Sequence, residues 1–289
     1  MKQLIVIGGP TASGKTALAI KVAQHYGTEI ISADSRQFYR ELSIGAARPT
    51  EKELSTVPHH FIADRSVTTP LSAGCYAEEA LQRLDRLFTQ YPVVVAVGGS
   101  GLYLRALCEG LDEFPDVTQA ARTQVKAVYR KEGLPGLQRI LRTTDPDYYE
   151  RVDRQNPRRL QRALEVSLTA GRPYSSFLGQ RTARRSFTSH YFMPALERTS
   201  LYQRIDQRVN RMLGEELENE ARQLYPLREL RALQTVGYQE WWPYMEGIYN
   251  GERAVELIKR NSRRYAKRQL TWFKHYQRVA GAEAVLLTR

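Results

Sequence analysis

The sequence predicts an α/β fold in which a parallel sheet core carries an inserted all-helical domain and a helical C-terminal region. Three observations predict it. A glycine-rich pattern directly follows an apolar stretch near the N-terminus. Strand-like and helix-like stretches alternate over the first third of the chain, which indicates parallel pairing with right-handed crossovers. Residues 116–180 have helical spacing without a strong strand signal, and strand character resumes after them.

The first third supplies most of the expected sheet. Continuous apolar or β-branched runs predict strands over 3–10, 29–34 and 92–101, with a short strand over 59–64. Helical spacing predicts helices over 15–27 and 75–90, and Gly27 fits the C-cap of the earlier one.

The rest of the chain is expected to be mainly helical. Basic amphipathic patterns separated by Gly and Pro predict helices over 118–133, 134–144 and 156–171. A strand is expected over 186–196, and helices over 199–225, 238–249 and 251–279. We therefore assign residues 1–114 and 186–289 to the core, and 115–185 to a helical insertion.

Charge is distributed unevenly along the 289 residues, which carry a net charge of +12. Residues 116–185 hold 15 Lys and Arg against 7 Asp and Glu, and residues 251–289 hold 10 against 3. Two segments thus account for the whole excess. Such local concentration indicates a polyanionic partner such as nucleic acid, although a solvated basic surface would give a weaker bias of the same sign.

Several function classes receive no support. No run approaches the roughly 20 apolar residues of a membrane span, and the N-terminus has no signal-peptide pattern. Cys75 and Cys108 are too far apart for a metal-ligand spacing or a disulfide framework. We expect a soluble, cytoplasmic monomer with two free thiols, no membrane contact and no obligate protein partner.

The glycine-rich pattern is a phosphate-binding loop, since Gly9, Gly14, Lys15 and Thr16 match G-x-x-x-x-G-K-[ST] between a strand and a helix. Backbone N–H groups and the helix N-terminus would face an anion there. Lys15 would neutralise terminal phosphate oxygens, and the Thr16 hydroxyl would bind Mg²⁺. The expected diphosphate contacts are Gly9, Pro10, Thr11, Ala12, Ser13, Gly14, Lys15 and Thr16.

An acidic residue expected of nucleotide hydrolases is missing. Their Mg²⁺ is held partly by an Asp at the end of an apolar strand, whereas the stretch 93–97 leads into Gly-Gly-Ser-Gly. This argues against a nucleotide-driven motor. Asp34 instead stands at the end of the second expected strand, on the sheet edge that holds the phosphate loop. It could accept a proton from a nucleophile, or simply cap a helix.

Six segments, which occur in one order along nearly the whole chain, carry a resemblance: GPTASGKTALA, ISADSRQFYRELSIGAARPT, VGGSGLYLRALCEGL, NPRRLQRALEV, TVGYQE and RRYAKRQLTWF. Together they resemble the bacterial tRNA dimethylallyltransferases, also called tRNA isopentenyltransferases. The resemblance implies a P-loop kinase-like α/β core with a helical insertion that contacts tRNA.

The activity implied by this resemblance is a prenyl transfer. A dimethylallyl group would move from dimethylallyl diphosphate to N6 of the adenosine on the 3′ side of the anticodon, in tRNAs that read codons beginning with U. The partners would be the anticodon stem-loop of tRNA and dimethylallyl diphosphate, with Mg²⁺ as cofactor. The phosphate loop would hold the diphosphate, which would leave without phosphoryl transfer.

The resemblance also implies residue roles. Asp34 would contact the adenine amine, and Arg208, or else Arg204, would contact the diphosphate. Ser100 stands where the family usually has threonine, and it keeps the hydroxyl. The expected tRNA contacts are Asp34, Ser35, Arg36, Gln37, Ser100, Arg122, Arg158, Arg159, Leu160, Gln161, Arg162, Gln234, Thr235, Val236, Gly237, Tyr238 and Gln239.

The last predicted helix supports nucleic-acid binding independently, because residues 259–278 hold eight Lys and Arg and no Asp or Glu. Tyr265, Trp272 and Tyr276 are spaced by seven and four, so we expect them to pack inward and leave the basic residues for phosphates. A role of these aromatic rings in base stacking is the alternative.

Three other functions are alternatives to this one. An adenylate isopentenyltransferase would share the donor site but accept AMP, and a P-loop small-molecule kinase would use Lys15 and Asp34 with ATP. Neither needs the basic segments. A non-catalytic RNA-binding module would not need an intact phosphate loop together with Asp34.

Overall fold

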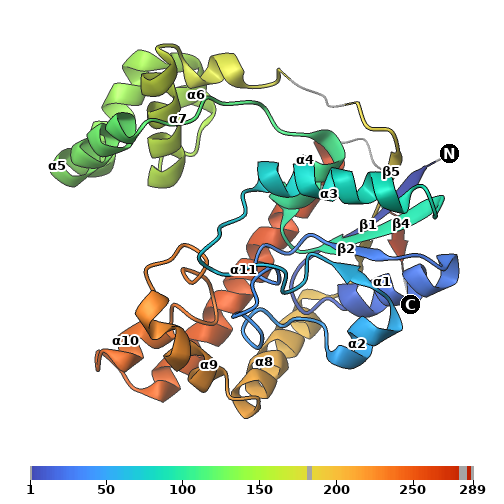
Figure 1. The fold of residues 1–289 in the computed structure, drawn as a ribbon. Helices are drawn as coiled ribbons and strands as arrows, with labels where there is room; N and C mark the ends of the chain where they lie inside the picture. Colours follow the sequence, from blue (N-terminus) through green and yellow to red (C-terminus); the bar gives the residue numbers. More distant parts are fainter. Residues whose placement is uncertain (1, 181–183, 280–284, 288–289) are drawn as a thin grey trace. The chain divides into compact units, whose positions relative to one another are not determined.

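Six parallel strands form the sheet of the protein, as seen in a computed structural model that describes residues 2–180, 184–279 and 285–287 (Figure 1). Their order across the sheet is β3-β2-β4-β1-β5-β6, and all neighbouring pairs run parallel. The strands are β1 (Gln3–Gly8), β2 (Ile30–Ser32), β3 (His59–His60), β4 (Val93–Gly98), β5 (Thr188–Pro194) and β6 (Val285–Leu287). The α/β fold expected from the sequence is therefore confirmed.

The chain divides into two compact units by its internal contacts. One contains Met1–Glu109 and Arg184–Arg289, and the other contains Gly110–Ala183. The sheet-containing unit also holds α1 (Lys15–Tyr26), α2 (Glu51–Thr56), α3 (Ala73–Leu87), α4 (Gly101–Glu109), α8 (Arg198–Gly214), α9 (Leu217–Leu224), the 3₁₀ helix η2 (Tyr225–Leu227), α10 (Trp241–Met245) and α11 (Gly251–Val279).

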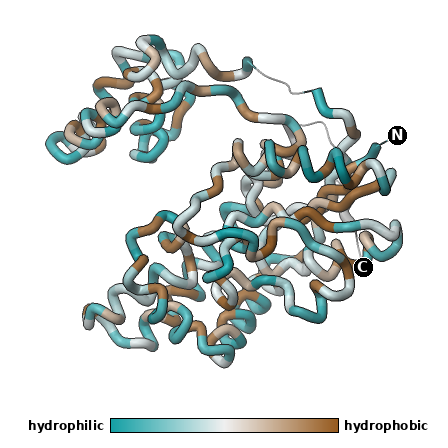
Figure 2. The backbone as a smooth tube through the Cα atoms, in the orientation of Figure 1, coloured by the Kyte–Doolittle hydropathy of each residue, from teal (hydrophilic) through white to brown (hydrophobic). Residues whose placement is uncertain are grey.

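The central strand β1 separates two apolar layers, because successive side chains of a strand point to opposite faces of the sheet. Leu4 and Val6 pack in the core that includes α3 and α4, whereas Ile5 and Ile7 pack against α1. Both faces of the strand are thus covered, which explains its uninterrupted apolar run. In Figure 2 the central strands are mostly brown, whereas teal residues are frequent in the helices around them.

A further apolar core lies among the C-terminal helices of the same unit. It joins residues of α8, α9, α10 and the start of α11 to Tyr39, Leu42 and Val67. Trp241 is almost fully buried within it. This core fixes α8 and α11 relative to the segment after β2, and that segment contributes to the site described below.

The other unit is helical in its described part. It contains α5 (Gln119–Thr144), α6 (Pro146–Arg151), α7 (Pro157–Ala170) and the 3₁₀ helix η1 (Tyr174–Phe177). Non-helical backbone at Gly133 divides α5 into two helices, as the sequence predicted. Val125, Leu137, Leu141, Leu160 and Leu164 form its core.

Some boundaries differ from the expectations. The strand expected to reach residue 101 ends at Gly98 because α4 begins at Gly101. The helix expected over 199–225 is interrupted by the positive φ of Glu216, and only Trp241–Met245 of the one expected over 238–249 is α-helical. None of the described helices has both the length and the apolar character required to cross a bilayer.

Candidate active site

The phosphate loop connects β1 to α1 and has the backbone that its glycines permit. Gly9 and Gly14 have φ of 141° and 88°, in the region that disfavours L side chains. A Cβ on Gly9 would also lie 3.1 Å from Cγ of Met193. Helix α1 begins at Lys15, so its first N–H groups lie where the sequence predicted an anion.

Two cavities meet beside this loop. The larger, of about 1230 Å³, is lined by residues 12–17, by parts of the segment 43–63 and by α8. The smaller, of about 140 Å³, is lined by Thr11, by Asp34 and its neighbours, and by parts of α8 and α11. The residues that line both are Lys15, Thr16, Ala47, Arg208 and Met212. Of the predicted loop contacts, Gly9 and Pro10 line neither cavity.

Lys15 is a cation at this junction. Its Nζ donates a 2.6 Å hydrogen bond to the carbonyl of Pro10. Burial lowers the pKa of Lys15 to about 8; Asp34 acts in the opposite direction, and Arg208 lowers the pKa further. An ammonium that burial has desolvated and that borders a cavity is suited to bind an anionic ligand.

Arg208 reaches the junction from α8. Its Nη1 donates to Oγ1 of Thr11 at 3.0 Å, and its Nη2 donates to the carbonyl of Ala47 at 3.3 Å. Burial lowers the pKa of this guanidinium. Arg204, one turn earlier, lines only the larger cavity.

Asp34 lies two residues after β2 and lines the smaller cavity. Its Oδ1 accepts a 3.0 Å hydrogen bond from the N–H of Arg36. No helix begins at this point, so the alternative that Asp34 caps a helix is wrong. The end of β2, just before Asp34, is held in place because the buried Tyr76 hydroxyl donates to the carbonyl of Ser32 at 3.0 Å.

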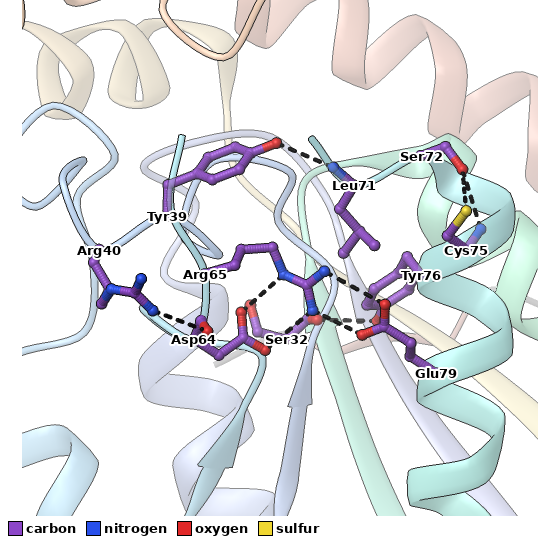
Figure 3. A network of polar contacts seen from close by, with 10 residues as sticks. All are labelled: Ser32, Tyr39, Arg40, Asp64, Arg65, Leu71, Ser72, Cys75, Tyr76 and Glu79. Atoms are coloured by element: carbon purple, nitrogen blue, oxygen red, sulfur yellow. Dashed lines mark hydrogen bonds and ion pairs between the residues drawn. The ribbon is translucent and has the colours of Figure 1, made fainter. Parts of the chain in front are cut away.

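A polar network supports this strand end from α3 and the segment 64–72 (Figure 3). Arg65 pairs with Asp64 at 3.1 Å and with Glu79 of α3 at 2.7 Å. The Tyr39 hydroxyl accepts the N–H of Leu71 at 3.4 Å. These contacts restrict the backbone on either side of residues 34–37.

Ser100 and Tyr265 approach Asp34 from β4 and α11. Ser100 Oγ accepts the N–H of Ser35 at 2.9 Å and donates to Oγ of Ser35 at 3.1 Å. The Tyr265 hydroxyl also interacts with Ser100, and the pKa of Tyr265 is raised to about 12 by burial and then by Asp34. Tyr265 is only partly buried and lines the smaller cavity, so it is not the core residue that its spacing indicated. The side chain of Tyr276 lies outside the described residues.

The loop 43–47 is held by one carboxylate that the sequence did not single out. Glu220 of α9 accepts the N–H groups of Ser43, Ile44 and Gly45, all within 3.1 Å. It also accepts the Tyr238 hydroxyl at 2.6 Å. Glu220 thereby positions the backbone that presents the Ala47 carbonyl to Arg208.

The predicted segment 234–239 contributes unevenly. Thr235, Val236 and Gly237 line the smaller cavity, as do Arg36 and Gln37. Gln234 is exposed, and Gln239 donates to Glu240 at 3.3 Å.

Two predicted tRNA contacts need correction. Tyr238 and Leu160 are fully buried. Tyr238 packs among the C-terminal helices, and Leu160 packs in the core of the helical unit. Their side chains therefore support the fold and cannot contact tRNA directly in this structure.

The helical unit displays the basic residues that the sequence predicted. Arg122, Arg158, Arg159 and Arg162 are exposed, and Gln161 is half-buried. The Arg162 guanidinium lies 5.6 Å from the ring centroid of Phe114, whereas Arg158 and Arg159 donate no side-chain hydrogen bond to a described residue.

Oxygen ligands for Mg²⁺ are few, which limits how the ion could be held. Thr16 lines both cavities, and its hydroxyl has no hydrogen-bond partner among the described residues. No cluster of three or more His, Cys, Asp or Glu suitable for a metal exists in the described part of the chain. These residues fit an Mg²⁺ shared with phosphate oxygens and water, the usual arrangement for this ion.

The sequence of this chain is similar to a known family and to several of its members. A family model described as IPP transferase matches residues 37–276. The chain is 47% identical over 271 residues to the tRNA dimethylallyltransferase of Christiangramia forsetii, covering 94% of this chain and 90% of the relative. It is 45% identical over 280 residues to that of Flavobacterium johnsoniae, covering 95% and 91%.

Solved structures agree with these relatives. The tRNA isopentenylpyrophosphate transferase of Bacillus halodurans superposes with a TM-score of 0.67 at 34% identity, covering 95% of this chain and 87% of that one. A eukaryotic dimethylallyltransferase acting on tRNA superposes with a TM-score of 0.82 at 24% identity, covering 99% and 74%. This second likeness shows a shared fold.

Proposed function

The chain belongs to the IPP transferase family, and on that premise we propose that it acts as a tRNA dimethylallyltransferase. It transfers the dimethylallyl group of dimethylallyl diphosphate to N6 of the adenosine on the 3′ side of the anticodon, in tRNAs that read codons beginning with U. Diphosphate is released. The observation that carries the proposal is that Lys15 and Arg208 line the same 140 Å³ cavity as Asp34.

The donor diphosphate binds on the phosphate-loop side. In the transfer, the bond between the allylic carbon and the diphosphate oxygen breaks, and its electron pair stays with the diphosphate. Lys15, Arg208 and the first N–H groups of α1 hold the charge that develops there. Fixed cations and dipoles stabilise such charge best in a site with little water.

Mg²⁺ fits this arrangement through the Thr16 hydroxyl and the diphosphate oxygens. When bound, it neutralises part of the charge of the leaving group. The exocyclic amine of adenine is a weak nucleophile, because its lone pair is delocalised into the ring. Asp34 orients this amine and accepts its proton as the new N–C bond forms, so that charge and atoms balance.

The acceptor adenine has to leave the anticodon-loop stack to reach Asp34, as is usual for enzymes that modify a base. Ser35, Arg36, Gln37 and the segment 235–237 surround it or its neighbours. Arg122, Arg158, Arg159 and Arg162 of the helical unit bind tRNA phosphates, which gives affinity that depends on salt. The roles of these residues are part of the proposal.

Incubation of the purified protein with labelled dimethylallyl diphosphate and Mg²⁺ tests the function. Separate reactions contain unmodified tRNA, the same tRNA with guanosine in place of the target adenosine, or AMP. A parallel reaction contains labelled ATP and small acceptors. Label transferred only to the unmodified tRNA is the expected result. Transfer to AMP, or phosphoryl transfer from ATP, would replace the proposal by one of the alternative enzymes.

A further inference from the structure

The two halves of the proposed site are joined by one buried side chain, which also lines the smaller cavity. Gln269 of α11 is 6% exposed. Its Oε1 accepts the N–H of Thr11 in the phosphate loop at 2.9 Å. Its Nε2 donates to the carbonyl of Gly99, at the turn between β4 and α4, at 2.8 Å.

Each partner of Gln269 leads to a different reactant. Thr11 lines the smaller cavity and receives the hydrogen bond of Arg208. Gly99 directly precedes Ser100, whose hydroxyl accepts the N–H of Ser35, the residue next to Asp34. The carboxamide therefore connects the diphosphate side of the site with the segment that carries the carboxylate.

The fit around Gln269 leaves little freedom. A Cβ on Gly99 would lie only 2.4 Å from its Nε2. Neighbouring residues of α11 are equally close to the same two turns, because a Cβ on Gly8 would lie 2.5 Å from Phe273, and one on Gly101 would lie 2.2 Å from Trp272. Helix α11 is thus packed closely against both turns.

The chemistry of the contact selects glutamine. One side chain must accept from an N–H and donate to a C=O at the same time, and a carboxamide does both. A carboxylate could only accept, and it would face the Gly99 carbonyl with a like partial charge. Methionine has similar length but offers neither hydrogen bond.

We propose that Gln269 is a positioning residue that sets the separation between the phosphate loop and the Asp34 segment, and so controls the transfer step. The inference rests on the proposed function. Gln269 also keeps the Thr11 N–H away from phosphate, so its loss leaves that N–H available to the donor. Donor affinity should therefore persist when Gln269 is replaced, while the alignment of the reacting atoms is lost.

The test compares Gln269→Met with the unaltered protein under saturating donor and tRNA. We expect kcat to fall roughly 10- to 100-fold, the size of effect that a misplacement near 1 Å produces. The Kd values for dimethylallyl diphosphate and for tRNA should each change less than about threefold, well below one decade of affinity. Gln24→Met, an exposed glutamine on α1, is the matched control and should retain full kcat.

Two further variants keep the test decisive if Gln269→Met folds poorly. Gln269→Glu retains the acceptor for Thr11 and loses the donor for Gly99, so it should also lower kcat. Gly99→Ala adds a Cβ that would clash with Nε2 of Gln269. If both residues act through one contact, the double variant with Gln269→Glu should be little worse than the poorer single variant.

The outcomes separate the inference from the proposed function. If the unaltered protein transfers no label to tRNA, the proposed function fails. If it is active and the folded Gln269 variants keep kcat, or lose donor affinity instead, the positioning role is overturned. Circular dichroism at the assay temperature measures the unfolded fraction of each variant. A loss of kcat that matches this fraction would also overturn the positioning role.

Discussion

Arg208 of α8 donates a 3.0 Å hydrogen bond to the hydroxyl of Thr11, which lies 197 residues earlier in the phosphate loop. The same guanidinium donates to the carbonyl of Ala47. The planar guanidinium thus has two hydrogen-bond partners and still borders both cavities. Its position therefore depends on the fold as a whole. Arg204 borders only the larger cavity, so the two arginines can be distinguished by experiment.

Arg208→Lys should lower kcat/KM for dimethylallyl diphosphate by roughly 10²- to 10³-fold, the usual loss when one stabilising donor is removed. Lysine keeps the charge but cannot form the forked contact. Arg204→Lys serves as the matched control and should cost less than about tenfold, because a side chain outside the smaller cavity adds less to the transition state. Equal losses, measured with saturating tRNA, would remove the distinction.

Asp34→Asn should reduce kcat by roughly 10²- to 10⁴-fold, the contribution of a general base. Asparagine can still accept the N–H of Arg36 through Oδ1, so the local backbone should survive. The Kd for tRNA, measured by filter binding, should therefore stay close to that of the unaltered protein. Asp64→Asn is the control in the adjacent network. If Asp34→Asn abolishes tRNA binding, Asp34 has a structural role.

Donor binding should weaken as pH rises through about 8. Lys15 has a pKa lowered to about 8 by burial, so its ammonium is present below that pH and is lost above it. The diphosphate attracts the charged form, hence the affinity declines between about pH 8 and 10, a range in which an ordinary lysine with a pKa near 10.4 stays largely charged. Calorimetric titration from pH 6.5 to 10 measures this. Lys21 is exposed on the same helix, so Lys21→Met should leave the profile unchanged. Constant donor affinity between pH 8 and 10 would refute the assignment.

Glu220→Gln should destabilise the fold by roughly 2–4 kcal/mol, because hydrogen bonds to a charged group contribute about 1.5–3 kcal/mol each and several are disturbed together. The new amide nitrogen would face backbone N–H groups of the loop 43–47. Urea unfolding gives the free energy. Glu218→Gln, on the same helix but half-exposed and paired with the exposed Arg222, should change it by less than about 1 kcal/mol.

Replacement of Arg158 and Arg159 by alanine should weaken tRNA binding and reduce its dependence on salt. If each arginine contacts one phosphate, the slope of log K against log salt should fall by roughly 1.4–1.8 for the pair. Arg83→Ala, on the exposed side of α3, is the control. An unchanged slope would exclude both arginines from the tRNA interface.

Much of the fold could be predicted from the sequence, since β1, β2 and β4 are continuous apolar runs and Gly27 ends α1 as expected. The order of strands could not, because it depends on pairing between distant segments. Helix α2 was missed although its signal is local: Thr50 and Glu53 form a capping box. The interruption at Glu216 has no such signal, because glutamate rarely adopts positive φ.

The site was predicted only where a contiguous motif carries it. Lys15, Thr16 and Asp34 follow strands at one edge of the sheet, which the sequence makes visible. Glu220 and Gln269 act through backbone groups more than 150 residues away in the chain, and no spacing reveals such partners. Tyr265 was assigned to the core because its spacing to Trp272 suits a buried helix face; that face also borders the cavity.

The position of Gln269 near the C-terminal end of α11 has a consequence for synthesis. The helical unit is one unbroken stretch of chain, Gly110–Ala183, with its own apolar core, so all of its residues are translated before α8. The sheet-containing unit, which carries the proposed site, instead needs segments from both ends of the polypeptide. A nascent chain can thus complete its basic helical unit long before it can perform any chemistry, and the enzyme is finished only when its last long helix has been translated.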